Sequence, residues 1–434
     1  MALSIHNWSK LDNDSRVALL RRPAVAADER VRKDTVEIIA RVREDGDAAV
    51  RELTRDFDGA TIDRLLITTD EIDEARDQLS EEQIGAIDLA IANVRRFHEQ
   101  QRPGGIIVET MPGVVCERIS HPLDAVGLYV PAGTAPLPSA AIMLAVPAAI
   151  AGCPTQILCT PPRSDGTADP AVIVAAVRSG VDRIFKIGGA QAIAAMAYGT
   201  ESVPQVCKVF GPGNAWVTSA KSLVSSDPAG AAIDMPAGPS EVLVMADATA
   251  SPAYVASDLL SQAEHGADSQ VLLVTTSDIL AADVNREVAR QLAALPRAEI
   301  AGAALEHSRI VLVDSLEDAI AVSNLYAPEH LILQIDEARA ALPYLRNAGS
   351  VFVGPWTPES AGDYCSGTNH VLPTYGFART YSGLGLDQFM RQMTIQELTR
   401  DGLGQLGEAV MTLARLEGLE AHAQAVRVRL ESSE

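Results

Sequence analysis

Short apolar segments alternate with alanine-rich segments through most of this chain, and the alternation limits the possible folds more than any other feature. A first series of such segments ends at a glycine- and proline-rich joint at 229–240, and a second series begins directly after it. Because alternating strands and helices form parallel sheets covered by helices, we expect an α/β fold with two facing doubly wound, incomplete Rossmann-like units. The expected strands are 126–130, 156–160, 183–187 and 206–210 in the first series, and 241–245, 271–275, 309–313, 331–335 and 350–353 in the second.

The segments outside these two series are predicted to be mainly helical. Residues 34–53 and 84–94 carry apolar side chains at helical spacing, whereas 106–125 has β-branched pairs around Gly113 that suggest a short hairpin. Beyond residue 380 we expect helices again. The chain is therefore expected to form an N-terminal helical arm at 1–24, a discontinuous first α/β domain at 25–125 and 236–380, a second α/β domain at 126–235, and a C-terminal helical domain at 381–434.

Composition excludes several classes of partner. The chain of 434 residues has a formal net charge of −22, which would repel the phosphates of a nucleic acid. Its N-terminus has no apolar signal core, and its longest uncharged apolar run, 140–153, is too short to span a bilayer and contains Pro147. The five cysteines form no C-x-x-C pair, so neither a disulfide framework nor a thiolate zinc site is indicated. We expect a soluble cytoplasmic protein with no membrane partner.

The most informative short segment is the end of a predicted helix at 258–266. Gln262 and His265 are three residues apart, so their side chains emerge from the same side of that helix, and Gly266 stands where a helix commonly ends. An amide oxygen beside an imidazole nitrogen forms half of a metal or substrate site. Taken alone, such a pair is more often a hydrogen-bonded surface pair, so its interpretation depends on what other segments contribute.

A second candidate pair lies at the entrance to an expected strand. Glu329 and His330 follow Pro328, which disfavours helix in the residue before it and constrains the turn. A positioned Glu–His pair can divide general-base work between two protons. The alternative is an ordinary polar strand entry.

Two further segments carry acid or imidazole groups. Asp363 is the one carboxylate in a predicted long loop of small residues, and it becomes a ligand candidate if the fold brings it to the Gln–His pair. His370 in the same loop is a weaker candidate, because its neighbours suggest backbone capping. Near the C-terminus Gly418 is expected to end one helix at Glu417, so that His422 begins the next and the corner directs both side chains to one pocket. A solvated helix pair is an equally good interpretation of that corner.

The strand–helix alternation also prompts a search for a dinucleotide-binding fingerprint. No G-x-G-x-x-G segment follows any of the expected strands. Two glycine-rich turns, from Gly188 to Gln191 and from Gly211 to Asn214, stand at strand ends, where open sheets bind ligands. By themselves these turns do not establish a cofactor site.

Five motifs, in this order, resemble those of the histidinol dehydrogenase family, and the resemblance extends across nearly the whole chain. The motifs are DMPAGPSE at 234–241, LLSQAEHG at 259–266, YAPEH at 326–330, SAGDYCSGTNHVLP at 360–373 and EGLEAH at 417–422. The resemblance implies a homodimeric, NAD-dependent and zinc-requiring enzyme. It would oxidise L-histidinol to L-histidine through L-histidinal with two NAD⁺, in the last steps of histidine biosynthesis.

The resemblance also implies a role for each candidate residue. Glu329 and His330 would be catalytic, and the partner subunit would complete the site. One zinc ion per subunit would be held by nitrogen and oxygen donors, which do not exclude Mn²⁺ or Co²⁺. These metal ligands are Gln262, His265, Asp363 and His422. Together with the catalytic pair they would also contact the substrate, as would Ser240 and Glu417. The expected NAD contacts are Tyr129, Gln191 and Asn214.

Three alternatives are compatible with the same residues. A thiol route to the acid would need Cys365, Cys116 or Cys153, but no neighbouring residue clearly predicts a lowered thiol pKa. A related enzyme on the same scaffold would act on another amino- or hydroxy-substituted alcohol. A non-catalytic metal-binding relative would have no chemical need of Glu329 and His330 together.

Overall fold

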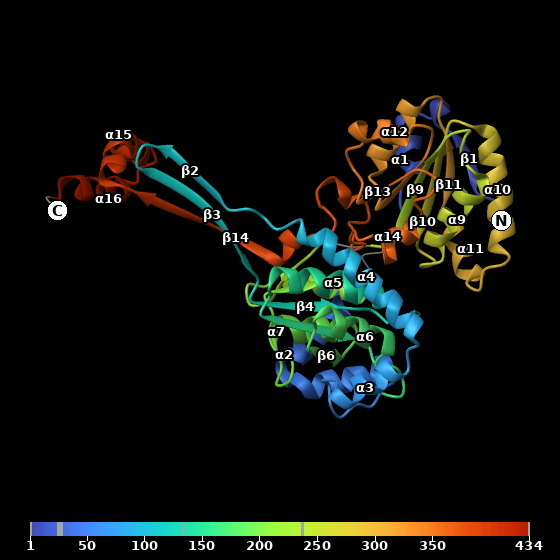
Figure 1. Ribbon diagram of the computed structural model, residues 1–434, viewed down its shortest axis with the longest axis horizontal. Helices are drawn as coiled ribbons and strands as arrows, with labels where there is room; N and C mark the ends of the chain where they lie inside the picture. Colours follow the sequence, from blue (N-terminus) through green and yellow to red (C-terminus); the bar gives the residue numbers. More distant parts are fainter. Residues whose placement is uncertain (1, 24–28, 133–134, 236–237, 433–434) are drawn as a thin grey trace.

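Two parallel sheets form the frame of the molecule, as the strand–helix alternation predicts. The computed structural model describes residues 2–23, 29–132, 135–235 and 238–432, and Figure 1 shows the two α/β units side by side with an arm extending from them. The smaller sheet has the order β6-β5-β4-β7-β8, and the larger has the order β1-β11-β10-β9-β12-β13. Apart from β1 at the edge of the larger sheet, each sheet starts in its middle and reverses direction once, which is the doubly wound arrangement.

The five-stranded unit is built around β4. Helices α5 and α6 cover one face of its sheet and α7 and α8 cover the other. The strands are β4 (Ala125–Tyr129), β5 (Thr155–Thr160), β6 (Arg183–Lys186), β7 (Lys208–Phe210) and β8 (Ala232–Ile233). The helices are α5 (Pro138–Ala151), α6 (Pro170–Ser179), α7 (Gly189–Tyr198) and α8 (Ala215–Ser225). The strands are largely apolar and α5, α6 and α7 are rich in alanine, because both faces of the parallel sheet are covered by helices.

The six-stranded unit repeats this winding from β9 onward. Helices α9, α10 and α11 cover one face, and α1, α12 and α13 cover the other. Its strands are β1 (Ser4–Asn7), β9 (Glu241–Ala246), β10 (Gln270–Thr275), β11 (Arg309–Leu312), β12 (His330–Gln334) and β13 (Ser350–Val353). Its helices are α1 (Asn13–Leu19), α9 (Pro252–Ala263), α10 (Asp278–Leu292), α11 (Ala298–Glu306), α12 (Leu316–Tyr326), α13 (Ala338–Ala341) and α14 (Glu359–Tyr364).

The packing differs from the expected domain division in two places. The three N-terminal helices α2 (Glu29–Asp58), α3 (Thr69–Asp77) and α4 (Glu81–Glu99) pack against the five-stranded unit, not the six-stranded one. Their apolar stripes find complementary surfaces on α5 to α8. The N-terminal arm is not purely helical, because β1 adds a parallel strand to β11. The expected boundaries at 24–25 and 235–236 touch residues outside the described ranges.

An extended arm leaves the five-stranded unit as a three-stranded antiparallel ribbon (Figure 1). The hairpin predicted around Gly113 is present, as β2 (Ile106–Met111) and β3 (Val114–Pro122). The prediction of a purely helical segment from residue 381 was wrong, because Met390–Leu398 forms the strand β14. This strand pairs with β3 along its whole length. A polar, half-exposed strand depends on its partner for backbone hydrogen bonds and carries a weak sequence signal. Beyond it, α15 (Arg400–Leu416) and α16 (Glu420–Glu431) cap the arm.

The turn after β7 shows how the backbone is fixed at the edge of the smaller sheet. Gly211 has φ +120, and a Cβ atom there would overlap the carbonyl oxygen of Tyr129. Its amide donates to Asp234 Oδ2 at 2.8 Å, and its carbonyl accepts from Lys221 Nζ at 2.8 Å. Lys221 and Asp234 also form a buried ion pair. Both backbone groups of Gly211 are therefore held by charged partners on either side.

We predict that Gly211→Ala lowers the free energy of unfolding by at least about 1–3 kcal/mol, because the left-handed backbone and the contact with Tyr129 both oppose a side chain. Gly302→Ala is the matched control. A Cβ at Gly302 in α11 meets nothing within 4 Å, so this change should stabilise the protein by about 0.5–1 kcal/mol. Chemical denaturation of both variants measures the difference, and equal effects would contradict the role given to Gly211.

Candidate active site

Helix α9 brings Gln262 and His265 to the amino end of the larger sheet. Gln262 is fully buried on the last turn, and His265 follows the helix end with an exposed face. The Gln262 amide is satisfied when its nitrogen faces Glu359 Oε1 at 2.8 Å and its oxygen faces His265 Nδ1 at 3.3 Å. The pair is therefore part of a cluster and not a simple surface pair.

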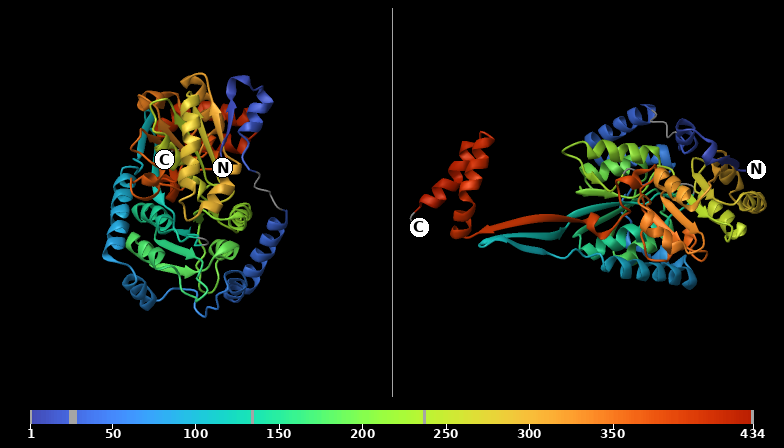
Figure 2. Two further views of the ribbon diagram at one scale, coloured as in Figure 1. Left: turned by 90° about the vertical axis from the view of Figure 1, so that its right-hand side faces the viewer. Right: turned by 90° about the horizontal axis from the view of Figure 1, so that it is seen from above.

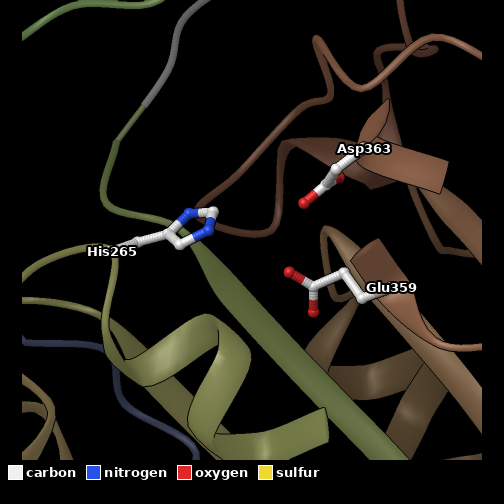
Figure 3. Close-up of side chains that lie close together, drawn as sticks. All are labelled: His265, Glu359 and Asp363. Carbon is white, nitrogen blue, oxygen red and sulfur yellow. The ribbon is translucent and has the colours of Figure 1, made fainter. Parts of the chain in front are cut away.

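Helix α14 supplies two carboxylates to the same cluster. The segment expected to be a loop forms this short helix up to Tyr364, so Glu359 and Asp363 are one turn apart and share a face. One ligand atom each from His265, Glu359 and Asp363 lie within 4.8 Å of one another. Figure 3 shows the three side chains pointing toward a common point. Sequence analysis missed Glu359, although its position four residues before Asp363 would have indicated it had the segment been recognised as a helix.

Glu329 and His330 stand where β12 begins, beside β9. Ala327 adopts a left-handed conformation with φ 55, which turns the chain into the strand. The Glu329 carboxylate accepts from the backbone amide of Glu241 at 2.9 Å, and His330 Nδ1 lies 3.2 Å from the Glu241 carbonyl. His330 Nε2 lies 3.7 Å from Asp363 Oδ1 and is buried with no hydrogen-bond partner. The predicted pair therefore adjoins the cluster formed by α9 and α14.

A buried acid supports this pair from behind. Glu241 accepts from the backbone amide of Glu329 at 3.2 Å, and it forms an ion pair and bidentate hydrogen bonds with Arg22 from the N-terminal arm. Arg22 also donates to the carbonyl of Tyr326 at 2.8 Å, and its guanidinium lies 3.9 Å from the centre of that ring. Because a bidentate Arg–carboxylate pair fixes orientation, Glu329 is held from both its amide and its carboxylate.

Burial and like charges shift the proton affinities in the cluster. Burial raises the pKa of Glu329 to about 8 and that of Glu359 to about 8. Burial alone would lower the pKa of His330, but Glu359, Glu329 and Asp363 together raise it well above its ordinary value. Burial would raise the pKa of Asp363, yet the neighbouring His330 lowers it. Perturbed, mutually coupled groups in one place are typical of a catalytic site.

Two other candidates lie at the edge of this cluster. Ser240, partly exposed, directly precedes Glu241 at the start of β9, and Pro236 and Ala237 of the same motif are outside the described residues. His370, the weaker candidate, has its Nδ1 4.0 Å from Asp363 Oδ1. His370 therefore lies beside Asp363 at the edge of the cluster.

The structure does not bring Glu417 and His422 to the cluster within one chain. Gly418, with φ +74, ends α15 and separates it from α16, as the sequence predicts. Both side chains are exposed and flank the turn between α15 and α16, the helices that Figure 1 and the right view of Figure 2 place at the end of the arm, away from the two α/β units. The cluster in one chain thus lacks these two members.

The three expected cofactor residues lie at or near the carboxyl edge of the smaller sheet. Tyr129 ends β4, and its hydroxyl accepts from the amide of Gly189 at 3.0 Å. Asn214 caps α8 by accepting from two backbone amides. Gln191 is buried, and neither its Oε1 nor its Nε2 has a hydrogen-bond partner. Buried polar atoms without partners suit a ligand that supplies the missing hydrogen bonds.

The cysteines give no support to a thiol route. All five are free. Cys153 is buried, and burial raises the pKa of its thiol to about 11. Cys116 lies on β3 in the ribbon, away from the cluster. Cys365 ends α14, two residues after Asp363, and its carbonyl accepts from Asn93 at 2.9 Å.

Comparison with known proteins agrees with the motifs. The family model described as histidinol dehydrogenase matches residues 20–430. A histidinol dehydrogenase from Vibrio parahaemolyticus is 53% identical over 98% of this chain and 97% of its own length, and one from Xanthomonas oryzae is 54% identical over 99% of each chain. The crystal structure of histidinol dehydrogenase from Elizabethkingia anophelis is 44% identical, with a TM-score of 0.96 over 99% of this chain and 98% of that one.

Within the described residues, every helix is too short or too polar to cross a bilayer. The comparisons, the two doubly wound sheets and the Gln–His, Glu–His and Asp motifs converging at one sheet edge lead to the same assignment. The chain belongs to the histidinol dehydrogenase family of oxidoreductases.

Proposed function

We propose that the protein oxidises L-histidinol to L-histidine through L-histidinal, in the last steps of histidine biosynthesis, with NAD⁺ as acceptor and one zinc ion per subunit. One observation carries the proposal: three of the four expected metal ligands meet the Glu329–His330 pair at a single place. A catalytic pair and a metal cluster in contact can serve two successive oxidations without release of the aldehyde.

The residues present fit a zinc ion. Gln262 oxygen, His265 nitrogen and Asp363 oxygen are the donor types that zinc accepts, and His422 would be the fourth. When bound, zinc would orient the amino alcohol through its nitrogen atoms, which lowers the entropic barrier to reaction. Glu359 would hold Gln262 in this orientation, because its carboxylate accepts a hydrogen bond from the Gln262 amide nitrogen. Outer groups of this kind commonly fix the orientation of ligands.

His330 is the proposed base of the first oxidation. Its Nε2 is buried and has no hydrogen-bond partner, so it is available to take the alcohol proton as hydride leaves the neighbouring carbon. His330 acts as a base only in its neutral form, and the surrounding carboxylates, which raise its pKa, stabilise the imidazolium that forms once it has taken the proton. When bound, NAD⁺ would accept the hydride in each of the two steps.

Glu329 is the proposed base of the second oxidation. It would take a proton from the water that adds to the aldehyde, while the protonated His330 would give its proton to the aldehyde oxygen, and the resulting hydrate is oxidised next. Its two anchors to Glu241 hold the carboxylate in position, and burial makes its ionised form a stronger base than an ordinary glutamate. Ser240 would contact the substrate from the start of β9.

We place the dinucleotide at the carboxyl edge of the smaller sheet. Tyr129, Gln191 and Asn214 support this position, because the crevice where a doubly wound sheet reverses direction commonly binds nucleotides. In this sheet the reversal falls between β4 and β7, at Tyr129 and the Gly211 turn. A backbone-lined edge can bind an anionic cofactor despite the net charge of −22.

We further propose a homodimer in which each arm completes the site of the other subunit. His422 is needed by the metal donor set and Glu417 by the substrate contacts, but both lie at the corner between α15 and α16 at the end of the arm. Leu413, Leu416 and Ile107 on the arm are exposed apolar side chains. Apolar surface of this kind marks a protein contact. We propose the cytoplasm as the compartment, which suits five free cysteines, and neither nucleic acid nor membrane as a partner.

The yield of NADH per histidinol tests the proposed reaction. We expect two NADH for each histidinol consumed, and removal of the metal with a chelator should abolish the yield while added Zn²⁺ restores it. A yield of one would indicate oxidation of an alcohol only, and no NADH at all would contradict the proposed activity. Alanine substitutions at Cys365, Cys116 and Cys153 should leave the yield unchanged.

Glu329→Gln tests the proposed second base. With histidinal supplied, we expect the variant to lose about 10²–10⁴-fold in rate, because the base is removed while the amide keeps the shape. In the wild-type protein the rate of this step should rise with pH through about 8, since the pKa of Glu329 is raised to about 8 and its base form appears only as the proton leaves. Stopped-flow measurement of NADH at several pH values checks both points, and unimpaired aldehyde oxidation by the variant would remove Glu329 from this role.

Mixing two inactive variants tests the shared site. His265→Asn and His422→Asn should each be inactive alone. In a hybrid dimer one site receives both defects and the other receives none, so random reassociation should restore about one quarter of the wild-type activity. Size-exclusion chromatography confirms that hybrids form. Hybrids without activity would show that His265 and His422 act in the same chain.

A further inference from the structure

Asp58, the acid at the end of α2, lies beside the edge of the smaller sheet at which the dinucleotide is proposed to bind. It has no role in the mechanism proposed above. Asp58 is the last residue of α2, which packs against α7 and α8. A Cβ atom on Gly188 would lie 3.2 Å from Asp58 Oδ1, so the carboxylate touches the glycine turn that opens α7. A Cβ atom on Gly188 would also lie 2.8 Å from the Cβ atom of Pro161, the residue that directly follows β5. Asp58 therefore stands next to the carboxyl ends of both β5 and β6.

That position is significant because β5 is the second strand of the doubly wound sheet, counted outward from β4. In dinucleotide-binding folds a carboxylate about 20 residues after the glycine-rich turn, near this second strand, accepts hydrogen bonds from the adenosine ribose. Here the strand is followed by two prolines and Arg163. The next two acids are engaged elsewhere, because Asp165 is exposed and accepts from Thr167, and Asp169 is ion-paired with Arg163. Asp58 brings a carboxylate to the same edge from a distant part of the chain.

The hydrogen bonding around Asp58 is incomplete. Its Oδ2 is buried without a hydrogen-bond partner. Gln191, three residues after Gly188 in the first turn of α7, has two buried side-chain atoms without a partner. Burial raises the pKa of Asp58 to about 6. Asp58 is also close enough to Tyr129 for its charge to add to burial in raising the pKa of that phenol. Unpartnered acceptors at a ligand-binding edge are satisfied by hydroxyl donors.

The charge balance of this edge favours hydroxyl groups over a phosphate. Arg163, the basic residue closest after β5, is ion-paired with Asp169. A 2′-phosphate placed against Asp58 would meet a like charge, which is a means of rejecting the wrong ligand. We propose that Asp58 accepts the adenosine ribose hydroxyls of the dinucleotide and sets the preference for NAD over NADP, an inference that rests on the proposed NAD dependence.

Fluorescence titration of the full-length protein with NADH and NADPH, without histidinol, tests the assignment directly. We expect wild-type protein to bind NADH more tightly than NADPH. Asp58→Asn should raise the Kd for NADH about ten-fold or more, which is the range for loss of a hydrogen bond to a charged group. The ratio of the Kd for NADPH to the Kd for NADH should therefore fall. Asp56→Asn, at an exposed acid on the same helix end, is the matched control and should leave both affinities unchanged. An unchanged preference in Asp58→Asn would overturn the proposal.

A ligand-side comparison keeps the proposal testable if Asp58→Asn does not fold. Wild-type protein should bind NAD⁺ lacking the adenosine 2′-hydroxyl about ten-fold more weakly than NAD⁺, and this difference should vanish in a folded Asp58→Asn protein. In steady state the variant should raise KM for NAD⁺ with little change in kcat or in KM for histidinol. Equal binding of the two ligands by wild-type protein would overturn the role of Asp58. Wild-type protein that binds neither NADH nor NADPH would instead contradict the proposed cofactor.

Discussion

The buried carboxylate of Glu241 links more parts of this molecule than any other group. It begins β9, a central strand of the larger sheet, and forms an ion pair with Arg22 from the N-terminal arm. Its carboxylate accepts from the amide of Glu329, and its own amide donates to the Glu329 carboxylate. A buried acid without Arg22 would carry a large desolvation cost, so the N-terminal arm, the sheet and the turn at Glu329 are stabilised together.

The two sheets share a winding order but use opposite ends. The proposed cofactor residues lie at or near the carboxyl edge of the smaller sheet, where ligands bind in most doubly wound proteins. The Glu329–His330 pair instead lies at the amino edge of the larger sheet. The segment from Asp234, which holds the Gly211 turn, to Ser240 at the start of β9 is short, so these two edges are close neighbours in the chain. A substrate held at one edge can therefore meet a cofactor held at the other.

Much of this arrangement was predictable from local sequence, and the rest depended on distant contacts. Buried parallel strands are apolar, as in residues 242–245, and a glycine directly after a helical segment, as at Gly418, indicates where that helix ends. Glu359 was missed because α14 is only six residues long and rich in small residues. Arg22 was missed because nothing near it in the chain indicates Glu241 as a partner. The packing of α2, α3 and α4 on the smaller unit depends on which of two apolar surfaces fits their stripes, which periodicity does not specify.

The three-stranded ribbon of the arm joins strands that are synthesised far apart in time. Strands β2 and β3 end at residue 122, whereas β14, their third member, starts at residue 390. Roughly 270 residues must therefore be made in between, which takes about 14–54 s at usual rates of translation. During that interval the edge of β3 that later pairs with β14 has no neighbour, so the backbone hydrogen-bonding groups along it are unpaired. The last tenth of the chain thus protects one of its earlier strands from association with other nascent chains.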